Sequence, residues 1–578
     1  MLVNGTLIIP DNNTIPNTFN YKEYLYHKKI KYIIKIEDIK VINKNKSILY
    51  KIKDKIYKRV NSINNNEYIY AFILGDSSHI NENVYNNYKT NSITHLFALS
   101  GLHVTLFSSI IMFFISKITK NELLSFLIVS ILLIFFSFIA SFTPSILRAV
   151  IFFILSNINN IYYFFIKPKN LLYITFSILT FINPNYIFNN GFILSFTISF
   201  FILLFNEYNN KSSLLKISVI SFLSSLPIVI NMNYEINIIG FINNIFFIPF
   251  VSTLVFPISL ISIIIPRISF ILKLLTNILE FISSISSNIL NITLFFQKLN
   301  IIEIIIYYIL LILIIKKKRV IKYFIVLILF LYFKPNLDNN SYVYFLDVKQ
   351  GDCALIVSKH NKSIVIDTGG NLNYDLMNTS IIPFYKSIGL KKIDYLFISH
   401  GDADHCGFSS SLSNSFKVNN IYINNDNVNY CEKKLNYEYT SNYYKIDNIE
   451  IYSLNNTFYN NENDDSLFLL VIIDNYSFLF TGDVSKRVEE DIINKYNLNN
   501  IDVLKVAHHG SNTSTSNKFI STINPKYSVI SVGKDNKFGH PSSETLDVLS
   551  KSKIYRTDID GSISFKINDK LSVDLCKP

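Results

Sequence analysis

Apolar residues are concentrated between about residues 93 and 335, and polar residues dominate on both sides of this region. Ten successive apolar runs within it approach or exceed the length that crosses a hydrocarbon layer of about 30 Å. The pattern predicts eight to ten membrane-spanning helices, and so many runs disfavour the alternative of a buried all-α soluble domain. The runs lie near residues 95–116, 122–141, 145–166, 171–183, 190–206, 213–233, 237–264, 270–296, 300–315 and 320–334.

The flanking regions complete a three-part organisation. The polar start of the chain alternates Ile or Tyr with Lys near residues 30–36 and 48–56, which predicts short strands or an amphipathic segment. The first 30 residues are too polar for a signal peptide. We expect a short polar region at 1–92, a transmembrane domain at 93–335 and a soluble domain at 340–578.

The soluble region alternates strand-like and helical segments. Helical stretches lie at 486–496 and 543–551, between runs rich in β-branched and aromatic residues. Interleaved strands and helices predict a layered α/β domain. The strand-like runs cover residues 342–348, 353–357, 363–367, 393–399, 467–473, 476–481, 502–507 and 527–532.

Metal-ligating residues gather at the ends of these runs. The run that ends at Ser399 is followed by His400, Asp402, Asp404 and His405, which combine imidazole nitrogens with carboxylate oxygens in one loop. Such a loop is typical of a site for two adjacent divalent metals. Two metals about 3.5–4 Å apart activate water and stabilise both oxygens of an in-line displacement, so a phosphodiester is the natural substrate. Further along the chain lie Asp483, His508, His509 and His540, each at a strand end or in a glycine-containing loop.

Charge and cysteine content refine this picture only slightly. The chain carries 54 Lys and Arg against 42 Asp and Glu, a formal charge of +12. This excess suits nucleic acid or lipid headgroups, although an AT-rich genome would also enrich Lys, Asn and Ile. None of the four cysteines forms a C-x-x-C pair, so neither a sulfur-bound zinc nor a redox dithiol is expected. Structural disulfides are not implied, and we interpret Cys406 as a small packed core thiol.

The ordered metal motifs resemble those of metallo-β-lactamase-fold hydrolases. The segments Phe345–Asp352 and Ile366–Gly370 are similar to motifs of the competence subgroup of that fold. The resemblance implies a four-layer αββα domain that holds two divalent ions, Zn or Mn. It implies that Asp483 bridges the ions and that Asp404 orients or deprotonates the attacking water. The implied ligands are His400, Asp402, Asp404, His405, Asp483, His508 and His540, with His509 the alternative to His508.

The chain departs from the pattern of the fold in two respects that affect the metals. Asp402 replaces a histidine common elsewhere in the fold, and Asn463–Ser466 lies where many relatives have a third-motif histidine. These changes make the site rich in oxygen ligands and favour Mn over Zn. They also leave open a domain that binds metal weakly.

The membrane region is similar to the ComEC family, the inner-membrane channel for DNA uptake in competent bacteria. The resemblance rests on Thr94–Val104, Thr143–Ala149, Gly191–Phe196, Ser224–Pro227 and Asn243–Asn244 with Pro249. Three ionisable residues are costly in lipid and should face protein or water, namely His95, His103 and Arg148. They are candidates for the DNA path, with Arg148 the best placed to meet a phosphate, while packing roles for the two histidines remain the alternative.

The resemblance implies a multi-pass protein of the bacterial plasma membrane that takes up single-stranded DNA and hydrolyses the other strand. The implied partners are duplex DNA at the outer face, membrane lipid, a competence DNA receptor and a cytoplasmic DNA-translocation helicase. The positive loop Lys316–Arg319 favours the cytoplasm, which places the C-terminal domain outside. Only Asn17–Ile42 resembles the region of the family's oligonucleotide-binding module, which we expect to be missing or reduced. The alternatives are a channel with an inactive hydrolase domain and a metallo-phosphodiesterase acting on a non-nucleic substrate.

Overall fold

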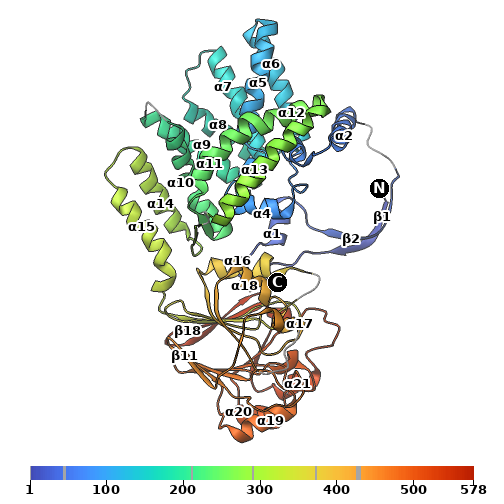
Figure 1. The fold of residues 1–578 in the computed structure, drawn as a ribbon, viewed down its shortest axis with the longest axis vertical. Coiled ribbons are helices and arrows are strands. Elements are labelled where there is room, and N and C mark those ends of the chain that lie inside the picture. The colour runs from blue at the N-terminus through green and yellow to red at the C-terminus, as the bar shows by residue number, and fades with distance from the viewer. Residues whose placement is uncertain (1, 43–46, 210–212, 290–291, 371–373, 425–430) are drawn as a thin grey trace. The chain divides into compact units, whose positions relative to one another are not determined.

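The computed structural model describes residues 2–42, 47–209, 213–289, 292–370, 374–424 and 431–578. The chain forms two compact units (Figure 1). The first comprises Met1–Ile8, Ile34–Leu294 and Leu299–Ile328, and the second comprises Ile9–Ile33, Phe295–Lys298 and Leu329–Pro578. The predicted combination of a helical membrane domain and a C-terminal αββα domain is confirmed.

The first unit contains the apolar helices. Among the described residues, seven helices are long and apolar enough to cross a membrane, and two shorter apolar helices, α8 and α14, match the runs near 171–183 and 300–315. The helices of this unit are α2 (Ile48–Asn61), α3 (Glu67–Ile69), α4 (Glu82–Thr90), α5 (Gly101–Thr119), α6 (Glu122–Ile139), α7 (Pro144–Ile161), α8 (Pro168–Ile182), α9 (Asn190–Tyr208), α10 (Leu214–Asn233), α11 (Gly240–Phe250), α12 (Phe256–Ile264), α13 (Ser269–Ile289) and α14 (Ile301–Ile315). Helix α15 (Ile321–Phe333) follows, and the short strands β3 (Glu235–Asn237) and β4 (Thr293–Phe295) pair with each other.

A proline inside α10 illustrates how the membrane helices satisfy their backbone. Pro227 lacks an N–H, which leaves the carbonyl of Leu223 without its helical donor. The Tyr307 hydroxyl of α14 donates to that carbonyl at 2.7 Å, and the Tyr308 hydroxyl donates to the Ser224 carbonyl at 3.0 Å. Since lipid offers no donor, this pairing lets the helix continue through the proline and joins α10 to α14.

The N-terminal region divides between the two units. Strands β1 (Leu2–Ile8) and β2 (Ile33–Lys40) form a two-stranded sheet, and the amphipathic run near 48–56 is the helix α2. Between the strands, residues 9–33 with α1 (Tyr21–His27) pack on the C-terminal unit. Ile15 is 3% exposed in its core, and the Ser562 amide donates to the Thr14 carbonyl at 2.8 Å.

Two stacked β-sheets form the centre of the second unit. An eight-stranded sheet has the order β10-β9-β8-β7-β6-β5-β18-β19, and a seven-stranded sheet has the order β11-β12-β13-β14-β15-β16-β17. The first is built from β5 (Ser341–Phe345), β6 (Ala354–Val357), β7 (Ser363–Ile366), β8 (Ile393–Phe397), β9 (Val418–Ile423), β10 (Glu438–Tyr439), β18 (Ser562–Ile567) and β19 (Leu571–Cys576). The second is built from β11 (Tyr443–Ile446), β12 (Ile449–Ser453), β13 (Leu469–Ile473), β14 (Tyr476–Phe480), β15 (Val503–Lys505), β16 (Tyr527–Ile530) and β17 (Lys553–Arg556).

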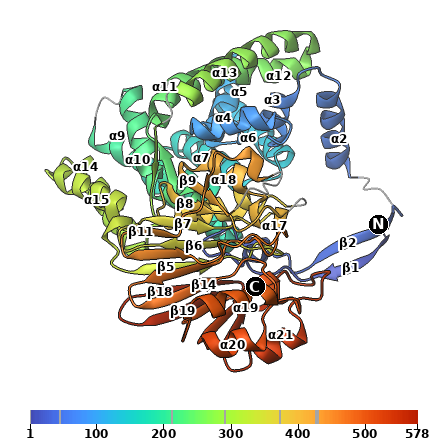
Figure 2. The ribbon, with the colours of Figure 1, turned by 60° about the horizontal axis from the view of Figure 1, so that its bottom comes forward.

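Helices cover the outer faces of both sheets and complete four layers. Helices α16 (Ile382–Ser387), α17 (Ala403–Cys406) and α18 (Ser409–Ser415) pack on the first sheet. Helices α19 (Lys486–Lys495), α20 (Asn517–Ile523) and α21 (Ser543–Val548) pack on the second, and Figure 2 shows α20 and α21 beyond the stacked strands. The short α22 (Thr557–Asp560) joins β17 to β18. Alternate side chains of both sheets form the buried layer between them.

Candidate metal centre

The loop that follows β8 carries the first group of ligand residues. Strand β8 is buried and ends before His400, and Asp402 is the N-cap residue of the single-turn helix α17. His400 is 4% exposed and His405 is fully buried, whereas the Asp402 and Asp404 side chains are 47% and 34% exposed. The two histidines therefore line the floor of the site and the two aspartates lie at its rim.

Two neighbouring strands of the seven-stranded sheet bring two further groups to the same place. Asp483 follows β14, and His509 follows β15. The Nε2 atom of His405 lies 3.4 Å from Asp483 Oδ1, and the Nε2 atom of His509 lies 3.4 Å from Asp404 Oδ2 and 3.7 Å from Asp483 Oδ2. Within the described residues, potential ligand atoms cluster in the sets His400/His405/Asp483 and Asp404/His405/His509.

Four buried polar atoms at this point lack hydrogen-bond partners among the described residues. They are the Nε2 atoms of His400, His405 and His509 and the Oδ1 atom of Asp483. Leaving a buried polar atom without a hydrogen bond costs roughly 1–3 kcal/mol, so the group favours an added binding partner. Imidazole nitrogens and carboxylate oxygens that converge in this way fit divalent cations.

The opposite nitrogen of each buried imidazole is fixed by a partner. His405 Nδ1 lies 2.9 Å from Asp367 Oδ2, His509 Nδ1 lies 2.9 Å from the Ser531 carbonyl, and His400 Nδ1 lies 3.0 Å from the Ser399 hydroxyl. A carboxylate or carbonyl at Nδ1 places the proton there and leaves Nε2 free to bind a metal. Asp367 and Ser531 thus orient the rings of His405 and His509.

Opposite charges in the cluster shift the proton affinities strongly. Burial alone would raise the pKa of Asp483, but the adjacent His405 and His509 hold it well below its usual range. Burial would lower the pKa of His509, yet Asp483, Asp352 and Asp404 raise it to about 9. The two imidazoles therefore carry protons at neutral pH in the absence of a cation, and a metal that binds them would release those protons.

A buried lysine completes the charge balance. Lys505, at the end of β15, is 4% exposed, and its Nζ lies 2.6 Å from Asp352 Oδ2. Burial favours the neutral carboxyl, but Lys505 and the nearby histidines keep the pKa of Asp352 far below normal. The sequence carried a signal for this residue, since Lys505 is the single charged position in the apolar run 503–507.

Two glycines explain the short motifs that precede the ligand loop. A Cβ on Gly351 would collide with the Asp404 carbonyl, and a Cβ on Gly370 would collide with the Ala403 carbonyl. Gly351 also has φ +122°, a backbone conformation that L side chains rarely adopt. The segments 345–352 and 366–370 therefore serve the site by letting the ligand helix α17 pack directly on their backbone.

Consecutive left-handed residues separate the two neighbouring histidines. His508, His509 and Gly510 have φ values of 49°, 54° and 83°. His509 is buried in the cluster, whereas the His508 side chain is 31% exposed, with Nε2 3.9 Å from Asp483 Oδ2. His540 lies on the outer side of His508, with ring centroids 5.9 Å apart. The structure thus brings all the predicted ligand residues to one edge of the fold, with His508 and His540 outermost.

The stretch where relatives have a third-motif histidine has a structural role. Asp465 is 1% exposed and accepts the backbone amides of Tyr459 and Asn461. The Ser466 hydroxyl accepts the Asp483 amide at 3.3 Å, and a Cβ on Gly482 would lie 2.6 Å from the Ser466 Cβ. The Ser466 hydroxyl and the close contact between Ser466 and Gly482 therefore support the backbone at Asp483.

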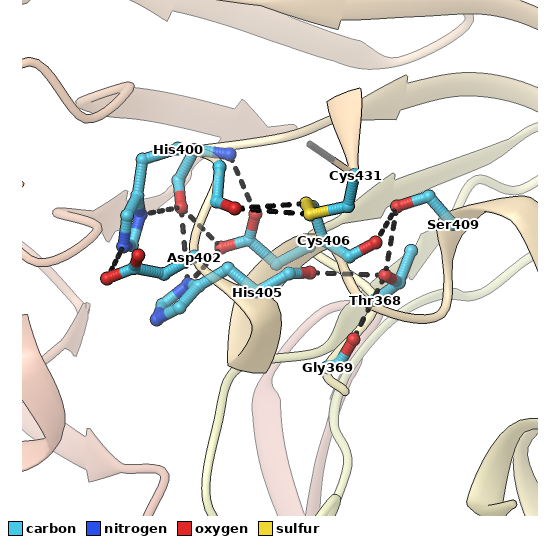
Figure 3. The surroundings of a disulfide bond; sticks show 11 residues. Thr368, Gly369, His400, Asp402, His405, Cys406, Ser409 and Cys431 are labelled. Atoms are coloured by element: carbon cyan, nitrogen blue, oxygen red, sulfur yellow. Dashed lines mark hydrogen bonds and ion pairs between the residues drawn. A yellow bond between two sulfur atoms is a disulfide. The ribbon is translucent and has the colours of Figure 1, made fainter. Parts of the chain in front are cut away.

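A disulfide lies directly behind the ligand loop (Figure 3). Cys406 bonds to Cys431, so the interpretation of Cys406 as a free core thiol was wrong. The pairing links two segments 25 residues apart, and sequence spacing without C-x-x-C gave no signal for it. In Figure 3 the His400 and His405 rings lie together on the side away from the sulfurs. The bond therefore anchors α17 from the face opposite the ligands.

The three ionisable residues predicted for the DNA path have different surroundings. His95 lines a cavity of about 430 Å³ together with Ser100, Asn244 and residues of α9 and α10. His103 is 1% exposed, accepts the Ser100 amide and packs between aromatic rings. Arg148 donates to the Ser195 hydroxyl at 3.0 Å. Among the three, His95 borders the cavity, His103 has the packing role kept as an alternative, and Arg148 joins α7 to α9.

Comparisons with known proteins match both units. A model of the competence protein family matches residues 72–320, and a model of the metallo-beta-lactamase superfamily matches residues 346–534. ComE operon protein 3 of Bacillus subtilis (strain 168) is 25% identical over 98% of this chain and 80% of its own length. Competence protein ComA of Neisseria gonorrhoeae is 29% identical over 42% of this chain and 35% of its own length.

The similarity to solved structures is low. The metallo-beta-lactamase fold protein YhfI from Bacillus subtilis is 11% identical over 40% of this chain and all of its own length, with a TM-score of 0.29. The superfamily match and the strand order define the chain as a multi-pass membrane protein with a metallo-β-lactamase-fold domain. Residues 72–320 match the competence protein family, and the chain is similar over almost all of its length to ComE operon protein 3.

Replacing Cys431 with Ser should destabilise the C-terminal unit. Without this cross-link the unfolded chain gains conformational entropy, which lowers the free energy of unfolding by roughly 3 kcal/mol. Calorimetry of the full chain in detergent should therefore show a lower unfolding temperature for this unit. Cys576→Ser, which removes a half-buried free cysteine, is the control and should leave the transition in place. Equal transitions in the two variants would contradict an anchoring role for the disulfide.

Proposed function

We propose that the protein takes up one strand of DNA across the plasma membrane and that its metal domain hydrolyses the other strand. The observation that carries the proposal is the convergence of four buried polar atoms, on His400, His405, His509 and Asp483, beside the partly exposed carboxylates of Asp402 and Asp404. The competence match supplies the connection to DNA uptake. Phosphodiester hydrolysis is the chemistry that a paired-metal site of this kind serves.

The proposed ligand set follows the orphaned atoms. His400, His405, His509 and Asp483 offer buried free ligand atoms, and Asp404 and Asp402 close the set from the rim. Two divalent ions, Zn or Mn, would supply Lewis-acid stabilisation of the phosphodiester oxygens. Asp404 orients the attacking water and accepts its proton, since its carboxylate is both near His509 and open to solvent. The partly exposed His508 and His540 are proposed to face the substrate.

The metal domain is proposed to lie outside the plasma membrane. The positive loop Lys316–Arg319 precedes α15, and a cytoplasmic loop there would send the chain outward again. The disulfide between Cys406 and Cys431 supports this side independently, since disulfides persist in oxidising compartments and are rare in the cytosol. This position would expose the site to incoming duplex DNA.

A second candidate function is a DNA channel with an inactive hydrolase domain. The segment Asn463–Ser466, which has no histidine where many relatives of the fold have one, favours it, because one fewer imidazole is available to the metals. Metal content separates this function from the proposed one.

His509→Ala should lower metal content and His508→Ala should not. His509 offers a buried free Nε2, whereas His508 is 31% exposed and further from Asp483. We expect the purified full chain to bind up to two Mn or Zn ions, measured by elemental analysis, and His509→Ala to lose at least one of them. A larger loss in His508→Ala would reverse the assignment, and a wild-type chain without metal would favour the inactive-domain alternative.

Asp483→Asn should abolish DNA cleavage by the full chain with Mn or Zn. The amide removes a negative charge that lies 3.4 Å from His405 Nε2 and 3.7 Å from His509 Nε2, and a loss of at least about 100-fold is expected. His360→Ala, which changes an exposed histidine paired with Asp447, should cut like the wild type. Labelled-oligonucleotide cleavage with and without EDTA measures the effect. Equal cleavage by Asp483→Asn and wild type would refute the nuclease assignment.

The sidedness is testable in intact cells. An external protease should cleave the C-terminal unit. Treatment with N-ethylmaleimide before lysis should block free thiols and leave Cys406 and Cys431 unmodified, because these two cysteines are bonded to each other. A cytoplasmic marker protein that stays intact controls for leakage. Protection of the unit from protease together with alkylation of both cysteines would place it on the cytoplasmic side.

A further inference from the structure

An exposed aromatic ring lies at the rim of the metal centre. Phe538 belongs to the loop between β16 and α21 and is 69% exposed. Its ring is nearly parallel to that of His540, at an interplanar angle of 14° and a centroid distance of 5.9 Å. Single exposed apolar side chains are common on protein surfaces, and this one is distinguished by its place beside the site.

A continuous series of contacts connects this ring to the buried ligands. The His540 ring lies 5.9 Å from that of His508, and His508 Nε2 lies 3.9 Å from Asp483 Oδ2. Phe538 therefore lies two imidazole rings outward from the bridging carboxylate.

The loop holds Phe538 in place before any substrate arrives. The Asn536 side chain accepts the amides of Phe538 and His540 and donates to the carbonyls of Gly533 and His540. Gly533 is in turn packed against the backbone of Lys349 and Gln350. A ring fixed by its loop loses little conformational entropy on binding.

Lys537 supplies a positive charge beside this ring. It precedes Phe538 and is exposed, whereas Lys534 on the same loop is paired with Asp11 at 3.0 Å and Asp535 adds a negative charge. A positive residue next to an exposed aromatic ring is the combination that proteins use to hold single-stranded nucleic acid without reading its sequence.

We propose that Phe538 is a stacking platform for the nucleobase beside the scissile phosphate, with Lys537 contacting the neighbouring phosphate. This deepens the proposed nuclease function and rests on it. The substrate class is a nucleic-acid strand with unpaired bases, because a base inside a duplex has no free face for the ring. Phe538 positions the substrate and takes no part in the bond-breaking step.

The test compares a single-stranded oligonucleotide with an abasic strand of equal length and charge. With the full chain in detergent and Mn present, Phe538→Ala should weaken binding and cleavage of the base-bearing strand about tenfold and leave the abasic strand unchanged. Phe538→Trp should retain binding. Phe19→Ala removes a phenylalanine of similar exposure, 66%, from the segment before α1 and should match the wild type.

The outcomes separate the two proposals. Equal losses on both strands would mean that Phe538 maintains the loop and does not stack, and no loss on either strand would also overturn the stacking site. Fluorescence anisotropy with EDTA reports binding without turnover. If the wild type cuts neither strand while Phe538→Ala still loses affinity only for the base-bearing strand, the nuclease assignment fails and the stacking site stands.

Discussion

The site depends on one buried carboxylate, that of Asp367. Its Oδ1 accepts the Ser399 amide at 2.7 Å, and its Oδ2 accepts the Ser399 hydroxyl at 2.8 Å and lies 2.9 Å from His405 Nδ1. Asp367 follows β7, so this single group ties the end of one strand to the end of the next and to α17. Because β7 and β8 are parallel, their carboxyl ends meet at the same edge of the sheet. The carboxylate fixes the direction of His405 before any metal binds. Without it, the Ser399 amide and hydroxyl and the His405 ring would lose the partner that holds the ligand loop at this edge.

The sequence was sufficient for the parts whose signals are local. The apolar runs, the strands that end in ligand motifs and the identity of the ligand loop all depend on neighbours in the chain. Asp352, Asp367 and Lys505 were within quoted motifs or runs, yet their roles depend on contacts between strands far apart in sequence. The choice between His508 and His509 had the same limit, since adjacent residues differ here only through a left-handed turn. The disulfide between Cys406 and Cys431 could not be found from spacing, because the fold alone brings the two thiols together.

The division of the chain shows a further limit of local reading. Composition separates residues 1–92 from the soluble domain by more than 200 residues, but residues 9–33 are part of the C-terminal unit. Ile15 fills its core, Asn17 donates to the Ser387 hydroxyl, and Lys298 donates to Asn17. Two segments from either side of the apolar region are thus joined by polar contacts that composition does not encode. A fragment that starts at residue 338 would lack these contacts and expose the surface that Ile15 covers.

The left-handed turn at His508 and His509 directs two adjacent imidazoles to different parts of the site. A non-glycine residue in this conformation costs on the order of 1 kcal/mol, and two in succession persist only where the surroundings enforce them. Here the Ser531 carbonyl holds His509 Nδ1, and Thr513 lies against His508 Nδ1 at 3.3 Å. The result is one imidazole directed into the buried cluster and one directed toward solvent, from adjacent positions. In a strand the two side chains would point to opposite faces of the sheet, whereas here His508 Nε2 and His509 Nε2 lie 3.9 and 3.7 Å from the same oxygen of Asp483.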